Sequence, residues 1–245
     1  MTTIHIIGSS SKGNCYMIDS GGNILLLECG VSMNEIIRNI GNDFNRIVGC
    51  TSTHVHGDHL NVSTANELIK RGIPVYMGED VLKETDFTQF LAILSGQKSK
   101  VGGFVIQPFK VSHNVPNCGF LIETPTKERI VFVTDAIECR YKFKDIDCIM
   151  VECNHDDDTM LDNLDKSEVS MSHPENHLGL QDCSSFCKAN MNPHLKQVVL
   201  IHLSHQNINE DYALKSVQDA MKGIPVAVAH PNDTFTFEND NDWTL

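Results

Sequence analysis

The chain has 245 residues, of which 41% are hydrophobic, enough to build one sizeable core, so a disordered or fibrous protein is excluded. The formal net charge of -13 disfavours a general nucleic-acid coat protein, because such a surface repels polyanions. No run reaches the roughly 18 to 20 apolar residues that span a bilayer, and residues 1–8 lack a secretory signal pattern. We therefore expect a soluble cytoplasmic protein with no membrane partner.

Nine cysteines are an odd count in a chain that is too long to need disulfides. Several lie inside apolar runs, and no C-x-x-C pair exists, so a structural zinc knuckle has no support. We interpret the cysteines as reduced thiols that pack in the core.

The first third of the chain predicts a strand meander followed by alternating helices and strands. Ser32 and Glu35 form a capping-box pattern, and Ile36, Ile37 and Ile40 follow at helical spacing. Hydrophobic periodicity predicts strands at Thr3–Ile7, Asn14–Asp19, Asn23–Leu27, Arg46–Cys50 and Pro74–Met77, and helices at Ser32–Ile40 and Ser63–Arg71.

The rest of the chain continues this mixture and shows no internal repeat or linker. A predicted helix at Asp80–Ser95 carries an apolar stripe that packs in the core or, alternatively, forms a dimer or lid surface, so a homodimer stays open. Asp156–Glu175 shows no clear period, and Asn239–Asp242 is an acidic tail. Further strands are predicted at Val105–Val111, Cys118–Glu123, Ile130–Thr134, Cys148–Val151, Gln197–Ile201, Val226–Ala229 and Thr234–Phe237, and further helices at His177–Ala189 and Glu210–Met221. We predict a single α/β domain over residues 1–245, in which helices cover sheets.

The strongest chemical signal follows the predicted strand that ends at Cys50. The segment reads His54-Val55-His56-Gly57-Asp58-His59. Two imidazoles two residues apart can converge on one ion, and the Asp58-His59 pair can turn toward a second ion. Nitrogen and carboxylate ligands in this pattern predict a site for a divalent transition metal.

Three later polar residues follow predicted buried strands. His113 comes after Val105–Val111, Asp135 after Ile130–Thr134, and His202 after the strand that ends at Ile201. A lone histidine at a strand end is usually structural, but three such residues beside a His/Asp cluster indicate a shared functional site.

The order of these residues resembles the metallo-β-lactamase fold, and specifically its phosphodiesterase and nuclease branch. Segments Gly8–Asn14, Leu27–Gly30, Val151–Asp156 and Ile201–Ser204 are similar to the YycJ (WalJ)-like bacterial and phage members. The resemblance covers nearly the whole chain. It implies an αβ/βα sandwich with two metal ions in a cleft at one sheet edge.

The resemblance also implies roles for individual residues. His54, His56 and His113 would hold the first ion; Asp58, His59 and His202 would hold the second; and Asp135 would bridge them. The ions would be Zn²⁺, with Mn²⁺ as the alternative. A metal-activated hydroxide would attack phosphorus, with Asp58 and His177 as the catalytic residues. His177 would act as a general acid or a phosphate clamp; alternatively, it is a surface residue at a helix start.

Some positions are open or depart from the family pattern. Glu28 stands where the family has Asp; it could orient a ligand histidine or lie elsewhere. Val55 and Gly57 replace the usual Glu and Ser inside the histidine motif. Glu28, Glu152 and His155 could orient the ligand residues. Lys12 and Asn14 could bind a phosphate of the substrate; alternatively, residues 8–14 form a plain turn between strands.

The substrate expectation follows from charge. A processive nuclease needs a basic track, and the only local basic groups are Lys98/Lys100, Lys127/Arg129 and Arg140/Lys142/Lys144. The charge therefore favours a compact substrate. The resemblance in size and motifs to phage anti-Pycsar enzymes implies hydrolysis of 3′,5′-cyclic mononucleotides in the cytoplasm, that of the host if the chain is phage-encoded. The alternative is a YycJ-like single-strand DNA exonuclease, and a minor alternative is a non-enzymatic metal-binding interaction module.

Overall fold

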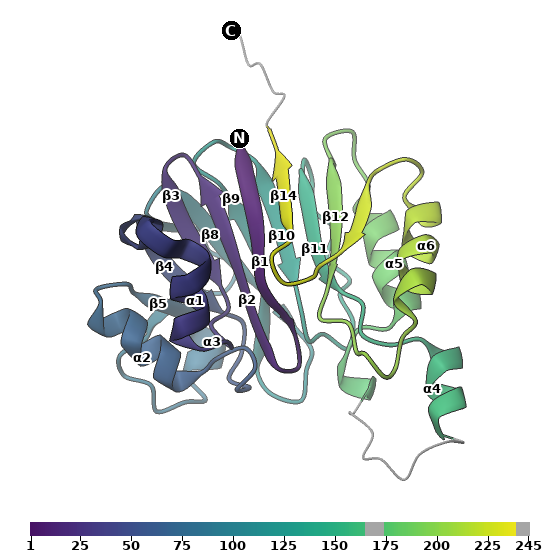
Figure 1. Ribbon diagram of the computed structural model, residues 1–245, viewed down its shortest axis with the longest axis horizontal. Helices are drawn as coiled ribbons and strands as arrows, with labels where there is room; N and C mark the ends of the chain where they lie inside the picture. Colours follow the sequence, from purple (N-terminus) through teal and green to yellow (C-terminus); the bar gives the residue numbers. More distant parts are fainter. Residues whose placement is uncertain (165–173, 239–245) are drawn as a thin grey trace, which may run out of the picture.

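Two seven-stranded sheets face each other in the computed structural model, which describes residues 1–164 and 174–238 (Figure 1). The first sheet has the order β14 (Thr234–Phe237), β1 (Thr2–Ser10), β2 (Gly13–Ser20), β3 (Asn23–Leu27), β4 (Ile47–Ser52), β5 (Val75–Gly78) and β6 (Leu91–Ile93). The second sheet has the order β13 (Val226–Val228), β12 (Gln197–Ile201), β11 (Cys148–Glu152), β10 (Arg129–Val133), β9 (Asn117–Glu123), β8 (Phe104–Val111) and β7 (Ser99–Val101).

The longer helices α1, α2, α5 and α6 each bury apolar residues in the core. The helix α1 begins at the Ser32–Glu35 capping box, as the sequence predicts, and buries Ile36 and Ile40. The others are η1 (Gly41–Arg46), α2 (Val62–Lys70), α3 (Glu79–Leu82), α4 (Asp157–Leu164), η2 (Pro174–Asn176), α5 (Leu180–Ala189) and α6 (Glu210–Ala220), with α1 at Met33–Ile40. The αβ/βα sandwich is thereby confirmed.

The core is divided into two layers by the second sheet. In β10, Ile130 and Phe132 belong to the apolar cluster between the sheets, whereas Val131 and Val133 belong to the cluster beneath α5 and α6. Successive side chains of a strand point to opposite faces, so a strand buried on both faces becomes a continuous apolar run. This is why the sequence of β10 shows no alternation.

The strands that carry the chemistry end at one edge. β10, β11, β12 and β13 pair in parallel, with Val133 beside Val151 and Glu152 beside Ile201. Residues that follow the carboxyl ends of parallel neighbours therefore meet. The N-terminus lies at the upper end of the molecule in Figure 1, and the β1–β2 hairpin turn at the lower end.

The predicted helix at Asp80–Ser95 is wrong. The helix α3 stops at Leu82, and the chain returns to the sheet as β6. Thr85 ends the helix because its hydroxyl donates to the Leu82 carbonyl and accepts from the Phe87 amide, which removes the next helical hydrogen bonds. The apolar stripe is correspondingly divided: Phe90 is buried, Leu91 and Leu94 are exposed.

Three further boundaries differ from the prediction. The loop expected at residues 8–13 is a tight hairpin, because β1 continues to Ser10 and β2 begins at Gly13. The predicted helix from His177 begins only at Leu180. The stretch without clear period contains α4, while its residues 165–173 and the acidic tail lie outside the described residues.

All nine cysteines are free, and eight of them are buried. Only Cys139 is half-buried. Within the described residues, no helix is both long and apolar enough to cross a membrane.

Candidate metal centre

Donor side chains from five strand ends converge at the lower edge of the sandwich. His54, His56, Asp58 and His59 lie in the loop after β4, and His113 follows β8. Asp135 follows β10, Glu152 ends β11 and His202 follows β12. The structure therefore brings together all seven residues of the expected ligand set.

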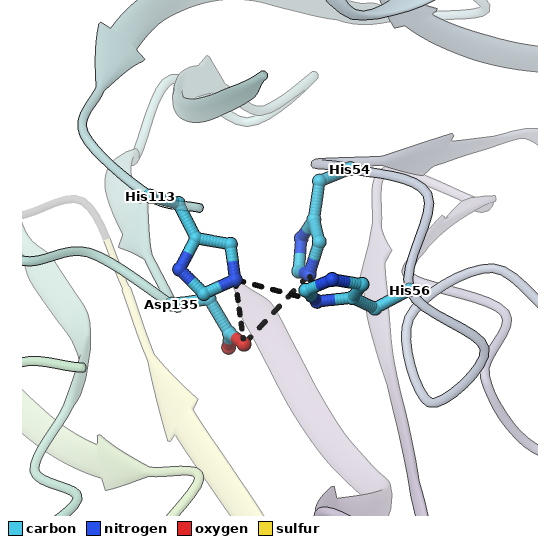
Figure 2. Close-up of side chains that lie close together, drawn as sticks. All are labelled: His54, His56, His113 and Asp135. Atoms are coloured by element: carbon cyan, nitrogen blue, oxygen red, sulfur yellow. Dashed lines mark hydrogen bonds and ion pairs between the residues drawn. The ribbon is translucent and has the colours of Figure 1, made fainter. Parts of the chain in front are cut away.

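The first group of donors consists of three imidazoles and one carboxylate, which point toward one another in Figure 2. His56 Nδ1 lies 3.1 Å from His54 Nε2 and 3.3 Å from His113 Nε2. Asp135 Oδ2 lies 3.7 Å from each of the two Nε2 atoms. Ligand atoms 2.0–2.1 Å from a tetrahedral ion lie about 3.3–3.4 Å apart, so these four atoms fit the first shell of one ion such as Zn²⁺.

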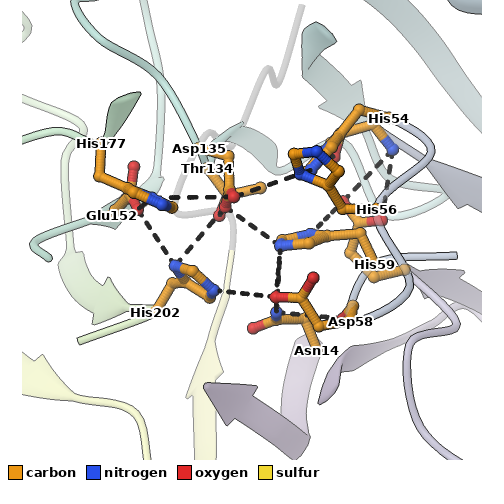
Figure 3. A network of polar contacts seen from close by, with 12 residues as sticks. Asn14, His54, His56, Asp58, His59, Thr134, Asp135, Glu152, His177 and His202 are labelled. Atoms are coloured by element: carbon orange, nitrogen blue, oxygen red, sulfur yellow. Dashed lines mark hydrogen bonds and ion pairs between the residues drawn. The ribbon is translucent and has the colours of Figure 1, made fainter. Parts of the chain in front are cut away.

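The second group surrounds the other oxygen of Asp135 (Figure 3). Asp58 Oδ2 lies 3.4 Å from His59 Nε2 and 3.3 Å from His202 Nε2. Asp135 Oδ1 lies 3.1 Å from His59 Nε2. Two carboxylates and two imidazoles at these separations also fit one divalent ion.

Asp135 is held rigidly between the two groups. Thr134 Oγ1 donates to Asp135 Oδ1 over 2.8 Å, and the side-chain amide of Asn117 donates to the backbone carbonyl of Asp135 over 2.7 Å. Burial alone would raise the pKa of Asp135, but the neighbouring His202 and His59 outweigh burial and hold the pKa well below its ordinary value. The Asp135 carboxylate is therefore ionised, and each of its two oxygens could accept a cation.

Three site residues have a backbone conformation that non-glycine residues rarely adopt. Asp135, His202 and Glu28 have φ values of 49°, 53° and 64°. Each such residue costs about 1–2 kcal/mol, and such strain collects at functional sites. Glu28 and His202 directly follow the last residue of a strand, and Asp135 comes one residue later, so the left-handed turn directs each side chain into the cluster.

Hydrogen bonds fix which nitrogen of two imidazoles faces the cluster. His113 Nδ1 donates to the Asn176 carbonyl over 2.8 Å, which leaves the Nε2 lone pair for an ion. His54 Nδ1 lies 2.9 Å from Thr53 Oγ1, so its Nε2 likewise faces inward. Burial lowers the pKa of both His54 and His113, which favours the neutral, metal-binding form.

Glu152 is the residue whose role the sequence left most open. It is fully buried, and its Oε1 lies 2.6 Å from His177 Nδ1 and 3.1 Å from His202 Nδ1. Its Oε2 accepts from the amides of Ala136 and Leu178, both over 3.1 Å. Glu152 therefore orients one expected ligand and the expected acid together, a position that only the strand pairing reveals.

His177 lies at the rim of the second group, where its side chain is 17% exposed. Burial lowers the pKa of His177, but the hydrogen bond to Glu152 outweighs burial and raises the pKa. A protonated imidazole that reaches both solvent and the donor cluster can give a proton to a substrate.

Two expected supporting residues hold the loop that carries Asp58 and His59. Glu28 accepts from the Thr53 amide over 3.3 Å, and its Oε1 lies 3.6 Å from His59 Nδ1. Asn14 is fully buried, and its side-chain amide donates to the Asp58 carbonyl over 3.1 Å. The expected contact between Asn14 and substrate is therefore corrected, because the side chain has no exposed surface to offer.

The remaining candidates lie outside the donor cluster. Lys12 is exposed at the β1–β2 turn. His155 packs against Gly179 next to α5, and no hydrogen bond among the described residues joins its ring to the cluster. The structure therefore gives His155 no contact with an expected ligand.

In the second group, the carboxylates favour protonated imidazoles. Burial would raise the pKa of Asp58, but hydrogen bonds from His202 and His59 hold the pKa well below its ordinary value. Burial lowers the pKa of His202, but Asp135, Asp58 and Glu152 raise the pKa to about 10. A divalent cation would displace these protons and supply the positive charge that the carboxylates require.

Comparisons with known proteins agree with the observed fold. A family model described as "Beta-lactamase superfamily domain" matches residues 25–203. No curated protein sequence matches the chain. Among solved structures, the metallo-beta-lactamase fold protein YhfI from Bacillus subtilis is 18% identical, with a TM-score of 0.70, and the match covers 96% of this chain and 98% of that one.

Two other similar structures carry functional names. The short form of human tRNase Z is 16% identical over 96% of this chain and 98% of that one, with a TM-score of 0.63. A diphosphatase from the PhnP family is 13% identical over 97% of this chain and 98% of that one, with a TM-score of 0.61. At these identities the likeness concerns the fold. The family model, which covers most of the chain, shows that this protein belongs to the metallo-β-lactamase superfamily.

Proposed function

We propose that this protein is a metal-dependent phosphodiester hydrolase with two divalent ions. The observation that carries the proposal is the position of Asp135: its Oδ2 faces the imidazoles of the first group, and its Oδ1 faces the imidazoles and the Asp58 carboxylate of the second. Two ions bridged by one carboxylate suit the in-line displacement of a phosphate ester. Zn²⁺ suits the nitrogen-rich donors, and Mn²⁺ is the alternative.

The ions, when bound, would supply positive charge and a water of lowered pKa. The residues of the chain supply the rest. Asp58, together with His59 and His202, would hold the second ion. His177 would donate a proton to the leaving oxygen, and Glu152 would keep its imidazole oriented and protonated through the 2.6 Å hydrogen bond.

The substrate that we propose first is a 3′,5′-cyclic mononucleotide. The net charge of -13 opposes long polyanions but hardly affects a ligand with one negative charge. The segments that resemble the YycJ-like branch, including phage anti-Pycsar enzymes, support the same choice. In this proposal the protein acts in the cytoplasm, that of the host if the chain is phage-encoded, and homodimer formation stays a prediction.

A second candidate, a single-strand DNA exonuclease, is favoured by the segment Arg140–Lys144. Arg140, Lys142 and Lys144 are exposed, and Tyr141 between them is 45% exposed. The Tyr141 ring stacks on Phe143, and the Asn190 side chain binds the backbone of both residues. An exposed aromatic ring among cations is a typical surface for stacked single-stranded bases.

The test is a parallel assay of purified protein. Elemental analysis should find close to two transition-metal ions per chain, and the loaded protein should hydrolyse bis(p-nitrophenyl) phosphate until a chelator is added. Cyclic AMP, cyclic UMP and a single-stranded oligonucleotide are then compared. Bound metal without turnover of any phosphodiester would indicate the metal-binding interaction module instead, and activity without metal would contradict the proposal.

A further inference from the structure

A cavity of about 390 Å³ lies beside the second group of donors. It is enclosed by the β1–β2 hairpin, the loop after β12 and the turn between β13 and β14. The hairpin and the loop touch where Ser9 Oγ accepts from the His202 amide over 3.0 Å. Ser9 and Leu203 both line the cavity, so its wall is continuous with the strand end that presents His202.

The inner wall of the cavity is apolar and rigid. Ile7, Val31, Ile208 and Val228 line it, and each is at most 8% exposed. A Cβ at Gly8 would lie 2.5 Å from the Gly13 carbonyl oxygen. Only glycine therefore lets the two hairpin strands lie this close to each other and to Val31. An aromatic ring of a ligand would find a preformed apolar surface here.

The rim of the cavity carries two carboxylates, one lysine and two histidines. Glu35 accepts from Ser32 in its capping box, and Glu210 pairs with His230 over 2.9 Å. Lys12 and His205 are exposed at the rim, and no ion pair among the described residues engages either of them. An unpaired lysine and an exposed imidazole at this rim can both donate hydrogen bonds to phosphate or sugar oxygens of a ligand.

We propose that this cavity binds the nucleoside next to the scissile phosphate, with the base on the apolar wall and phosphate or sugar oxygens at Lys12 and His205. The proposal rests on the proposed phosphodiesterase function. A volume of about 390 Å³ lies near the lower end for small-molecule sites and holds one nucleoside, not a strand. The nucleoside could belong to a cyclic mononucleotide or to the terminal nucleotide of a strand.

The experiment compares the variants Lys12→Ala, His205→Ala and Ile208→Trp with Lys98→Ala, a control at an exposed lysine outside this cavity. Lys12 and His205 are exposed, so their loss should leave folding intact, whereas tryptophan at position 208 fills the cavity. Each metal-loaded variant is assayed on cyclic AMP, on bis(p-nitrophenyl) phosphate, which has no nucleoside, and on an oligonucleotide. Binding of AMP is measured by calorimetry.

For each cavity variant we expect the ratio of kcat/KM on cyclic AMP to kcat/KM on bis(p-nitrophenyl) phosphate to fall about 10-fold, the usual effect of one lost charged hydrogen bond or a blocked wall. The Kd of AMP should rise by a similar factor, and Lys98→Ala should change neither. An effect on the oligonucleotide alone would assign the cavity to a strand terminus. Equal losses on both small substrates, or no change in AMP binding, would overturn the proposal. If wild-type protein fails to hydrolyse bis(p-nitrophenyl) phosphate, the proposed function fails instead, and AMP binding still tests the cavity.

Discussion

At the scale of single residues, Asp58 offers the cleanest test of the second ion. Its carboxylate lies on a loop and is 23% exposed, and it contacts His59 and His202. We expect Asp58→Asn to lose most of the second ion and most of the activity, because an amide is a poor ligand for a dication. Elemental analysis, turnover and thermal unfolding of the same preparation give the result.

The matched control for this variant is Asp86→Asn, an exposed aspartate outside the donor cluster. It should keep metal, activity and stability. If Asp58→Asn unfolds along with its loss of activity, the residue has a structural role and the ligand assignment is wrong.

His177 separates proton donation from phosphate binding. We expect His177→Ala to keep both ions and to slow hydrolysis of an alkyl phosphodiester by about 10²- to 10⁴-fold, the usual contribution of a general acid. A nitrophenyl ester has a good leaving group and should lose much less. Parallel kinetics on the two esters measure the difference, and equal losses would show that His177 binds phosphate without donating a proton.

The convergence of the expected ligand residues could be predicted, because their side-chain types and their positions after strands are visible in the sequence. The loop from His54 to His59 lies close to His113, Asp135 and His202, as expected. The role of Glu152 could not be predicted, because the contact of a strand's last side chain depends on the neighbouring strands. Asn14 was misjudged for the same reason: its place at the start of a strand does not say what its side chain contacts.

At the scale of elements, hydrophobic periodicity located every strand of the second sheet except β7, as well as α1 and α2. It failed at residues 80–95, where local hydrogen bonds of Thr85 override an apolar spacing that suits a helix. The segment before residue 165 was left without structure because α4 is polar, so its pattern carries no strong period.

A buried carboxylate joins the two sheets at the end of the sandwich away from the donor cluster. Glu128 accepts from the hydroxyls of Thr124 and Thr126 in the turn that joins β9 to β10 of the second sheet, and from that of Thr2 in β1 of the first. Burial alone would raise the pKa of Glu128, but these hydrogen bonds outweigh burial and lower the pKa to about 2. The lowered pKa means that ionised Glu128 stabilises the folded protein.

The sign of this contribution predicts a pH dependence. The stabilisation is present above the unfolded pKa of about 4.5 and is lost as the pH falls through about 2. It amounts to at most about 3 kcal/mol of unfolding free energy. We expect Glu128→Gln to be less stable at pH 7 and to approach the wild type as the pH falls from 4.5 to 2, measured by urea unfolding.

Glu123→Gln serves as the control, because Glu123 lies on the same hairpin but pairs with exposed Lys127. Its stability should follow the wild type across the whole range. A constant difference between Glu128→Gln and the wild type at all pH values would mean that packing, and not ionisation, explains the loss.

At the scale of the whole molecule, net charge separates the two proposed substrates. Each phosphate that a strand places on the protein releases condensed counterions, so kcat/KM for an oligonucleotide should fall steeply with salt. A cyclic mononucleotide carries one charge and should show a shallow dependence. With -13 overall, we expect efficient, salt-tolerant opening of cyclic nucleotides and weak trimming of DNA.

Kinetics at several salt concentrations with both substrates decide between them. Efficient exonuclease activity with no hydrolysis of cyclic nucleotides would replace the first proposal with the second. Removal of charge at Arg140, Lys142 and Lys144 should then lower the steepness of the salt dependence, because these are the exposed cations beside Tyr141.

Because eight of the nine cysteines are buried, the reaction of their thiols with a reagent can measure how often the protein unfolds. A thiol reagent that cannot enter the folded interior meets Cys139 alone, and burial raises the pKa of that thiol to about 11, so the reaction is slow. Each complete unfolding event exposes the other eight at once. Mass spectrometry of labelled protein would therefore show molecules with at most one tag or with nine. The rate at which the second population grows would give the rate of global unfolding in the absence of denaturant.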